Sequence, residues 1–232
     1  MAKIKGNYMF TGIIKEVGKI KKITGKNKST ELEVSCSQEI LKNLNKGDSI
    51  SVNGCCLTVK EYTKESFICD ISFSTQQNTT FKNIKTGEHV NIEDSLKYSD
   101  KLGGHLVTGH IDTVARILKI EKISNSYKFD IQAPENYLPY LAPKGSVALD
   151  GISLTIQDLN EKIFSITVIP YTFESTNLKL KKPEDLLNLE IDLFARYVVQ
   201  ILKFEDMKNL KEKLIDRDKI LKEKLIEHGF LQ

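Results

Sequence analysis

The chain has 232 residues, 40% of them hydrophobic and 28% charged, and its formal net charge is +3. This composition provides enough apolar residues for a core and is typical of a soluble globular protein rather than a disordered one. The nearly balanced charge argues against a nucleic-acid partner. No apolar run approaches the roughly 20 residues that a membrane span requires, so we expect no membrane partner.

The first half has the pattern of short β-strands separated by turns. Residues 50–53, 57–59 and 67–71 are rich in β-branched and apolar residues, which favours strands. Asn53-Gly54 lies between the first two and has the residues of a tight hairpin turn. A short helix is expected over residues 38–44. The pattern is typical of a small β-barrel or β-sandwich.

The pattern begins again after a break at residues 97–104, where turn-forming residues cluster. Thr11-Gly12 returns 97 positions later as Thr108-Gly109, and Asn53-Gly54 returns at the same spacing as Asp150-Gly151. About 20 residues are identical at this spacing, whereas chance would give about five. The sequence therefore predicts a tandem duplication of one β-rich domain.

The last part of the chain differs from both halves. The second half has one short expected helix of its own, at residues 135–141. From about Asp192, in contrast, the sequence becomes helical throughout. Apolar residues recur there at spacings of three, four and seven, which suits a helix that packs against a partner. We expect a self-association helix; the alternative is an amphipathic helix that lies on its own domain. The apolar residues are Phe194, Val198, Ile201, Leu202, Met207, Leu210, Leu214, Leu221 and Leu225.

The cysteines indicate a reducing compartment. Cys36, Cys55, Cys56 and Cys69 have no C-x-x-C spacing, and no histidine cluster completes a metal site. We expect reduced thiols, a cytoplasmic location and no metal. The sequence also lacks a phosphate-binding loop, a dinucleotide-binding glycine motif and the nucleophile motif of serine hydrolases.

Differences between the repeated motifs suggest two related pockets with different chemistry. His110 is the only imidazole within these motifs and could move a proton near neutral pH, although a structural role is the alternative. Cys56 is either a nucleophile or a packing thiol. Gly12 and Gly109 either let the backbone approach a ligand or serve turns. The substitutions between halves are Ile13 to His110, Asn53 to Asp150, Cys56 to Ser153 and Asp70 to Thr167.

Four long motifs, in consistent order from Met9 to about Tyr197, resemble riboflavin synthase of the alpha-chain type. They are Met9-Phe10-Thr11-Gly12-Ile13-Ile14, residues 52–59 around Gly54, residues 103–112 around Gly109, and Asp150-Gly151-Ile152-Ser153-Leu154-Thr155. The resemblance implies two tandem six-stranded antiparallel Greek-key barrels and a C-terminal α-helix that holds a homotrimer together. The implied divisions are residues 9–99, 100–197 and 198–232.

The resemblance also implies an activity. Two molecules of 6,7-dimethyl-8-ribityllumazine exchange a four-carbon unit and give riboflavin and 5-amino-6-ribitylamino-pyrimidinedione, without a metal or redox cofactor. The active site would lie between the N-terminal barrel of one subunit and the C-terminal barrel of the next. Association with lumazine synthase is a further possible interaction.

The residues that match the family's site form one predicted pocket in each half. We expect His110, Ser153, Cys56, Asp150 and Phe10 to serve catalysis. The first-half pocket would contain Gly12, Ile13, Ile14, Cys56, Leu57, Thr58, Asp70, Ile71, Ser72, Phe73, Ser74 and Thr75. The second-half pocket would contain Gly109, His110, Ile111, Lys144, Ser153, Leu154, Thr155, Val168, Ile169, Pro170, Tyr171, Thr172 and Phe173.

Three positions depart from the family's pattern. Ser74 and Gln76 replace an acidic residue and a leucine in the first half, and Tyr171 stands where glutamate or histidine is usual. The competing hypothesis is a non-catalytic, antenna-type protein that binds lumazine or flavin on the same fold. Such proteins tend to lose the histidine after Thr-Gly, and His110 is present here.

Overall fold

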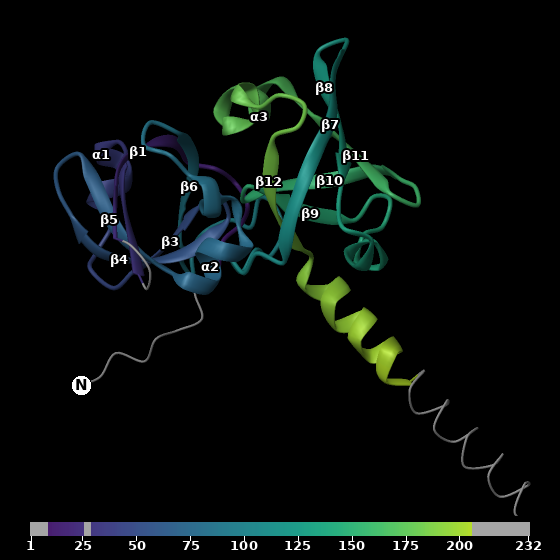
Figure 1. The fold of residues 1–232 in the computed structure, drawn as a ribbon, viewed down its shortest axis with the longest axis horizontal. Coiled ribbons are helices and arrows are strands. Elements are labelled where there is room, and N and C mark those ends of the chain that lie inside the picture. Colours follow the sequence, from purple (N-terminus) through teal and green to yellow (C-terminus); the bar gives the residue numbers. More distant parts are fainter. Residues whose placement is uncertain (1–8, 26–28, 206–232) are drawn as a thin grey trace, which may run out of the picture. The chain divides into compact units, whose positions relative to one another are not determined.

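The computed structural model describes residues 9–25 and 29–205. Within these residues each half of the sequence forms a closed six-stranded antiparallel barrel, which confirms the fold expected from the duplication (Figure 1). The first half contains β1 (Glu16–Thr24), β2 (Ser29–Ser35), α1 (Gln38–Lys42), β3 (Ser49–Val52), β4 (Cys55–Tyr62), β5 (Ser66–Ser72), α2 (Phe73–Asn78), the 3-10 helix η1 (Thr80–Asn83) and β6 (His89–Asp94). The second half contains β7 (Thr113–Ile123), β8 (Ser126–Gln132), η2 (Glu135–Tyr140), β9 (Ser146–Leu149), β10 (Ile152–Leu159), β11 (Ile163–Val168), α3 (Pro170–Ser175), η3 (Asn177–Leu180) and β12 (Leu186–Ile191).

The two barrels have the same strand order. The first runs β1-β2-β5-β4-β3-β6, and the second has the corresponding order from β7 to β12. β3, β4 and β5 form a meander, and β5 then pairs with β2, which gives the Greek-key connection. Bulges at Ile20 and Val59 recur at Ile117 and Ile156. They bend the long strands where each sheet closes on itself.

Each barrel has its own apolar core, because alternate residues of its strands point inward. Phe67 and Leu32 are fully buried in the first barrel, and Phe129 and Phe164 are fully buried in the second. Cys55 and Cys56 lie on opposite faces of β4, as expected for neighbours on a strand. Cys55 is buried in the core, whereas Cys56 is half-buried.

The two predicted hairpin turns meet where the barrels contact each other. Asn53 and Asp150 have φ values of 46° and 45°, and the glycine after each has a φ of 80°. Both central residues are therefore left-handed, as a type I′ turn requires. A Cβ atom on Gly54 would lie 2.7 Å from the backbone nitrogen of Gly151. Only glycine permits this contact between the turns.

A buried amide network joins the barrels around these turns. Asn91 donates from Nδ2 to the backbone oxygen of Asp150 at 3.0 Å, and Asn188 donates to that of Asn53 at 2.8 Å. Asn91 and Asn188 are equivalent positions of the repeat. The network therefore has an approximate twofold symmetry, and it satisfies polar groups that the junction would otherwise leave unpaired.

The symmetry is broken at Asp150. Its carboxylate accepts from Asn177 Nδ2 at 2.9 Å and pairs with Lys181 Nζ at 2.8 Å, and the Asp150 side chain is fully buried. The first half has Thr80 and Ile84 where the second has Asn177 and Lys181. One barrel therefore supplies a buried ion pair to the junction, and the other supplies no equivalent charge.

The short helices were predicted in part. The helix expected at residues 38–44 is α1, and the one expected at residues 135–141 is the 3-10 helix η2. The helices α2 and α3 were not predicted from the sequence, and α3 begins two residues after β11 ends at Val168. Pro170 at the start of α3 cannot continue the strand ladder but suits the first turn of a helix.

Residues up to Leu193 form one compact unit, and the helix residues that follow belong to a second unit. Residues 193–205 are helical, which confirms the beginning of the predicted C-terminal helix. Tyr197, Val198, Ile201 and Leu202 are more than half exposed on it. The apolar positions from Met207 to Leu225 lie outside the described residues. No helix among the described residues is long and apolar enough to cross a membrane.

Candidate functional site

The two Thr-Gly loops cross between the barrels. The backbone oxygen of Gly12, in the first half, accepts from the Ser153 nitrogen at 2.8 Å. That of Gly109, in the second half, accepts from the Cys56 nitrogen at 2.9 Å. Each of the two predicted pockets is therefore approached by a loop from the other half of the chain. In both cases the close contact is between a loop of one half and a strand of the other barrel.

Glycine is required at both crossings. Gly12 and Gly109 have φ values of 73° and 78°. A Cβ on Gly12 would lie 2.6 Å from that of Ser153, and a Cβ on Gly109 would lie 2.5 Å from that of Cys56. Side chains that follow the glycines also cross: Ile14 packs against the second barrel's core. Ile111 packs against the first barrel's core.

The Cys56 site is a small cavity of about 180 Å³ with walls from both halves. Burial raises the pKa of the Cys56 thiol above its ordinary value, although a hydrogen bond with Ser49 opposes the shift. Cys56 is therefore a neutral thiol near pH 7 and not a ready thiolate nucleophile. His110 is exposed beside it. The lining residues are Cys55, Cys56, Ser74, Thr75, Asn78, Thr79, Gly109, His110 and Ile111.

The Ser153 site contains a histidine that the sequence analysis missed. His105 Nδ1 lies 2.7 Å from Ser153 Oγ, in hydrogen-bond contact. Burial lowers the pKa of His105, with Asp192 opposing the shift, so the imidazole is neutral near pH 7. A neutral imidazole bonded to a serine hydroxyl can take up its proton. His105 belongs to the Gly103-Gly104-His105 run, but it has no counterpart among the described residues of the first half.

Two buried glutamates hold the crossed loops. Glu93 on β6 accepts three hydrogen bonds from Thr11 and Gly12, and Glu190 on β12 accepts three from Thr108 and Gly109. Neither glutamate was predicted from the sequence as a site residue. The available signal was an acidic residue within a buried strand, at equivalent positions of both halves.

Two of the predicted catalytic residues are buried and lie away from the exposed surface of the two sites. Asp150 is fully buried in the barrel junction, where its partners are Asn177, Asn188 and Lys181. Phe10 is also fully buried; its backbone pairs with Val107, and the two pack with Ala148 against Cys56. These positions suit roles in holding the loops rather than contact with a substrate.

Lys144 occupies a strained position. Its φ is 67°, and its counterpart in the first half is Gly47 with a φ of 90°. A lysine in the left-handed region costs free energy that glycine would not. The other predicted binding residues form three groups by exposure. Ile13, Thr58, Asp70, Ser72, Phe73, Ser74, Thr155, Ile169, Pro170 and Tyr171 are exposed, Ile14, Thr75, Ile111, Thr172 and Phe173 are half-buried, and Leu57, Ile71, Leu154 and Val168 are buried.

One of the departures from the family's pattern has a structural partner. Gln76 accepts from Thr30 Oγ1 through Oε1 at 3.0 Å. At the equivalent positions of the second barrel, Phe173 stacks on Tyr127 with ring centroids 3.7 Å apart. The two barrels therefore brace their equivalent short helices, α2 and α3, differently: one with an amide and a hydroxyl, the other with two aromatic rings.

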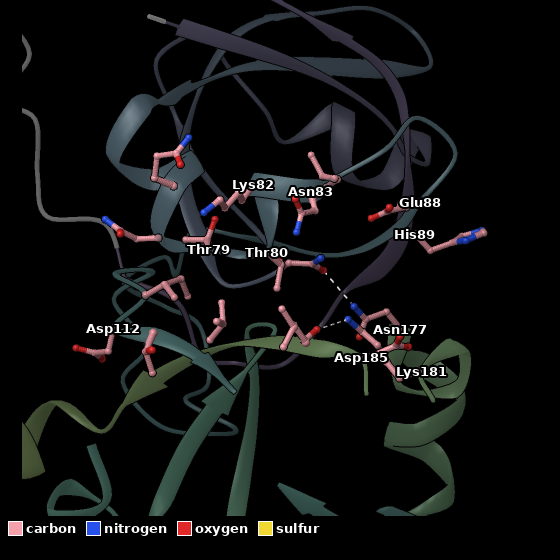
Figure 2. A pocket seen from close by; sticks show the side chains of 18 of the residues that line it. Thr79, Thr80, Lys82, Asn83, Glu88, His89, Asp112, Asn177, Lys181 and Asp185 are labelled. Atoms are coloured by element: carbon pink, nitrogen blue, oxygen red, sulfur yellow. Dashed lines mark hydrogen bonds between the residues drawn. The ribbon is translucent and has the colours of Figure 1, made fainter. Parts of the chain in front are cut away.

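A larger cavity of about 980 Å³ lies between the barrels (Figure 2). Thr79, Thr80 and His89 lie on one wall, and Asn177 and Lys181 lie on the facing wall. Amide, hydroxyl and charged groups of both signs dominate this lining, whereas a flat heterocycle needs apolar surfaces to cover its faces. We therefore place the candidate site at Cys56 and Ser153. Among the described residues, no three His, Cys, Asp or Glu side chains are grouped to hold a metal.

A family model described as lumazine binding domain matches the chain twice, over residues 11–95 and 108–192. The two matches have the same spacing as the repeat. The fold and the paired sites therefore define a protein with two lumazine-binding domains.

Curated relatives refine this class. Riboflavin synthase of Photobacterium phosphoreum is 36% identical over 206 residues, which cover 89% of this chain and 94% of the relative. Riboflavin synthase of Bacillus subtilis (strain 168) is 37% identical over 194 residues, covering 84% and 90%. The chain belongs to the riboflavin synthase family, as its motifs predicted.

Solved structures show the same fold. LumP complexed with riboflavin has a TM-score of 0.74 and 27% identity, over 79% of this chain and 99% of LumP. LumP complexed with 6,7-dimethyl-8-(1'-D-ribityl) lumazine has a TM-score of 0.72 at the same identity and coverage.

Proposed function

We propose that the chain catalyses the riboflavin synthase reaction. Two molecules of 6,7-dimethyl-8-ribityllumazine react: one gives up a four-carbon unit and becomes 5-amino-6-ribitylamino-pyrimidinedione, and the other receives the unit and becomes riboflavin. Atoms and electrons balance between the two substrates, so the reaction needs no external oxidant or reductant. The observation that carries the proposal is the pair of equivalent crossed sites, which differ in their polar side chains.

Two like sites suit a reaction between two identical molecules. The Cys56 site presents His110 and a neutral thiol, whereas the Ser153 site presents a serine bonded to a neutral histidine. The reaction needs a proton removed from the 7-methyl group of one lumazine and an addition to the other. Holding two flat heterocycles face to face supplies much of the rate by proximity.

We assign the chemistry to the groups that can reach a substrate. His110 and Ser153 move protons, and Cys56 contacts the ring as a thiol. His105 orients Ser153 and accepts its proton. Lys144 is retained in a strained turn because its amine contacts a substrate. The other predicted binding residues contribute the walls of the two sites.

The proposed active form is a homotrimer joined through the C-terminal helix. The exposed Tyr197, Val198, Ile201 and Leu202 support this assembly, because an apolar helical face is stabilised by burial against another chain. A site completed between the barrels of neighbouring subunits would bring one Cys56 site to face one Ser153 site. A cytoplasmic location and association with lumazine synthase remain predictions from the sequence.

A second candidate function is a non-catalytic lumazine- or flavin-binding protein, and the likeness to LumP favours it. The two functions differ in product. Purified protein is incubated with 6,7-dimethyl-8-ribityllumazine alone, and both lumazine and riboflavin are followed by chromatography. We expect riboflavin to form at half the rate of lumazine loss. Tight lumazine binding without riboflavin would contradict the enzyme and support the binding protein.

A further inference from the structure

We propose that Glu93 and Glu190 are positioning residues that act across the barrel junction: each is anchored in one barrel and sets the site on the other. This inference rests on the proposed function for its catalytic meaning. Its structural content concerns only the two loops and is tested separately.

The first step is the geometry of each carboxylate. Glu93 Oε1 accepts from the Thr11 nitrogen at 2.7 Å and from its Oγ1 at 2.6 Å, and Oε2 accepts from the Gly12 nitrogen at 3.0 Å. Glu190 makes the same three contacts with Thr108 and Gly109, at 2.7, 2.7 and 3.0 Å. Each carboxylate thus fixes two successive residues of its loop.

The second step is the charge state. Both side chains are 2% exposed, and every group that binds them is a donor. An ionised carboxylate only accepts hydrogen bonds, so it can satisfy all three donors of its loop. A protonated carboxyl or an amide would instead point an O–H or N–H group of its own at one of these three donors. Burial raises the pKa of both carboxyls above the ordinary value, and the hydrogen bonds from the loops offset this only in part. The loops therefore depend on the chemistry of a buried anion.

The third step is the direction of the loops. The loop that Glu93 holds ends on the second barrel, where the Gly12 oxygen accepts from the Ser153 nitrogen. The loop that Glu190 holds ends on the first barrel, where the Gly109 oxygen accepts from Cys56 and carries His110 to that site. A carboxylate that only stabilised its own barrel would not affect the site residue on the other barrel.

The test uses amide hydrogen exchange in the full chain with Glu93→Gln and Glu190→Gln. Glutamine keeps the shape but faces the glycine N–H with its own NH₂ group. We expect Glu93→Gln to speed exchange at the Ser153 amide at least tenfold and leave the Cys56 amide unchanged. Glu190→Gln should do the reverse. The Val59 amide, bonded to Asp48 within the first barrel, reports that the fold is intact.

Two control variants, Asp94→Asn beside Glu93 and Glu184→Gln near the start of β12, should leave both site amides unchanged. Faster exchange only within the mutated residue's own barrel, equal effects at both amides, or no effect in either variant would overturn the proposal. Turnover of lumazine is measured in parallel, and both glutamine variants should lower kcat at least tenfold. If the wild-type chain forms no riboflavin, the proposed function fails, while the exchange pattern still decides the positioning role.

Discussion

Replacing Lys181 tests how the barrel junction is stabilised. Lys181→Ile introduces the residue that the first half has at the equivalent position, Ile84. It leaves the Asp150 carboxylate fully buried without its ion-pair partner. Removing one member of a buried pair costs about 3–5 kcal/mol, and because the Lys181 side chain is 17% exposed, we expect about 3 kcal/mol.

The compensating change is Asp150→Asn, which restores the first half's Asn53 arrangement. Alone it leaves the donors of Lys181 and Asn177 facing an amide NH₂ group, at a cost of about 1–3 kcal/mol. With Lys181→Ile it removes the unpaired charge and leaves only the Asn177 donor facing the amide, so the double variant should lie within about 1–2 kcal/mol of wild type. The favourable coupling should therefore exceed about 2 kcal/mol.

The assay is urea unfolding followed by circular dichroism at a fixed protomer concentration. The control is Lys179→Ile on η3, the 3-10 helix that ends immediately before Lys181; Lys179 is exposed, and its loss should cost less than about 0.5 kcal/mol. A cost below 1 kcal/mol for Lys181→Ile, or a double variant as unstable as the worse single one, would refute the reasoning.

Three further outcomes are expected. His110→Ala should lower kcat at least about 100-fold without loss of stability, because the side chain is exposed. The control is His89→Ala, and equal turnover in the two variants would remove His110 from the mechanism. Ser153→Ala and His105→Gln should each lower turnover, and the double variant should be no worse than Ser153→Ala, since the two act as one unit; multiplying losses would contradict this. The pKa of His105 is lowered in the folded chain, so below about pH 6.5 the unfolded chain binds a proton that the folded chain does not. The wild type should therefore lose stability as the pH falls through this range, and His105→Gln should lose less. Urea titrations at several pH values will measure both losses.

The sequence predicted the repeated features well and the cross-barrel ones poorly. The repeat spacing and the two hairpin turns identified two equivalent barrels, because turn chemistry and strand alternation are local properties. The short helices α2 and α3 were missed, since each is only six residues long and too short to show helical periodicity. The C-terminal helix was found because its apolar spacing extends over several turns.

The structure brings the candidate residues together in a way that the sequence did not predict. Gly12 and Cys56 belong to the same half and both match the family's motifs, so both were expected in one pocket. In the structure the Gly12 oxygen instead accepts a hydrogen bond from the Ser153 nitrogen, because the loop that contains Gly12 leaves its own barrel before β1 begins. No pattern within one half predicts such a contact. His105 escaped notice for a different reason: its partner Ser153 is in the same half but 48 positions away along the chain.

The most direct test of the two-substrate reaction is the fate of the four-carbon unit. An equal mixture of unlabelled lumazine and lumazine labelled in that unit is supplied to the purified protein, and riboflavin is analysed by mass spectrometry. If each riboflavin combines two such units, one part will be unlabelled, two parts will carry one labelled unit and one part will carry two. Riboflavin that never carries two labelled units, or bound lumazine without product, would contradict the account.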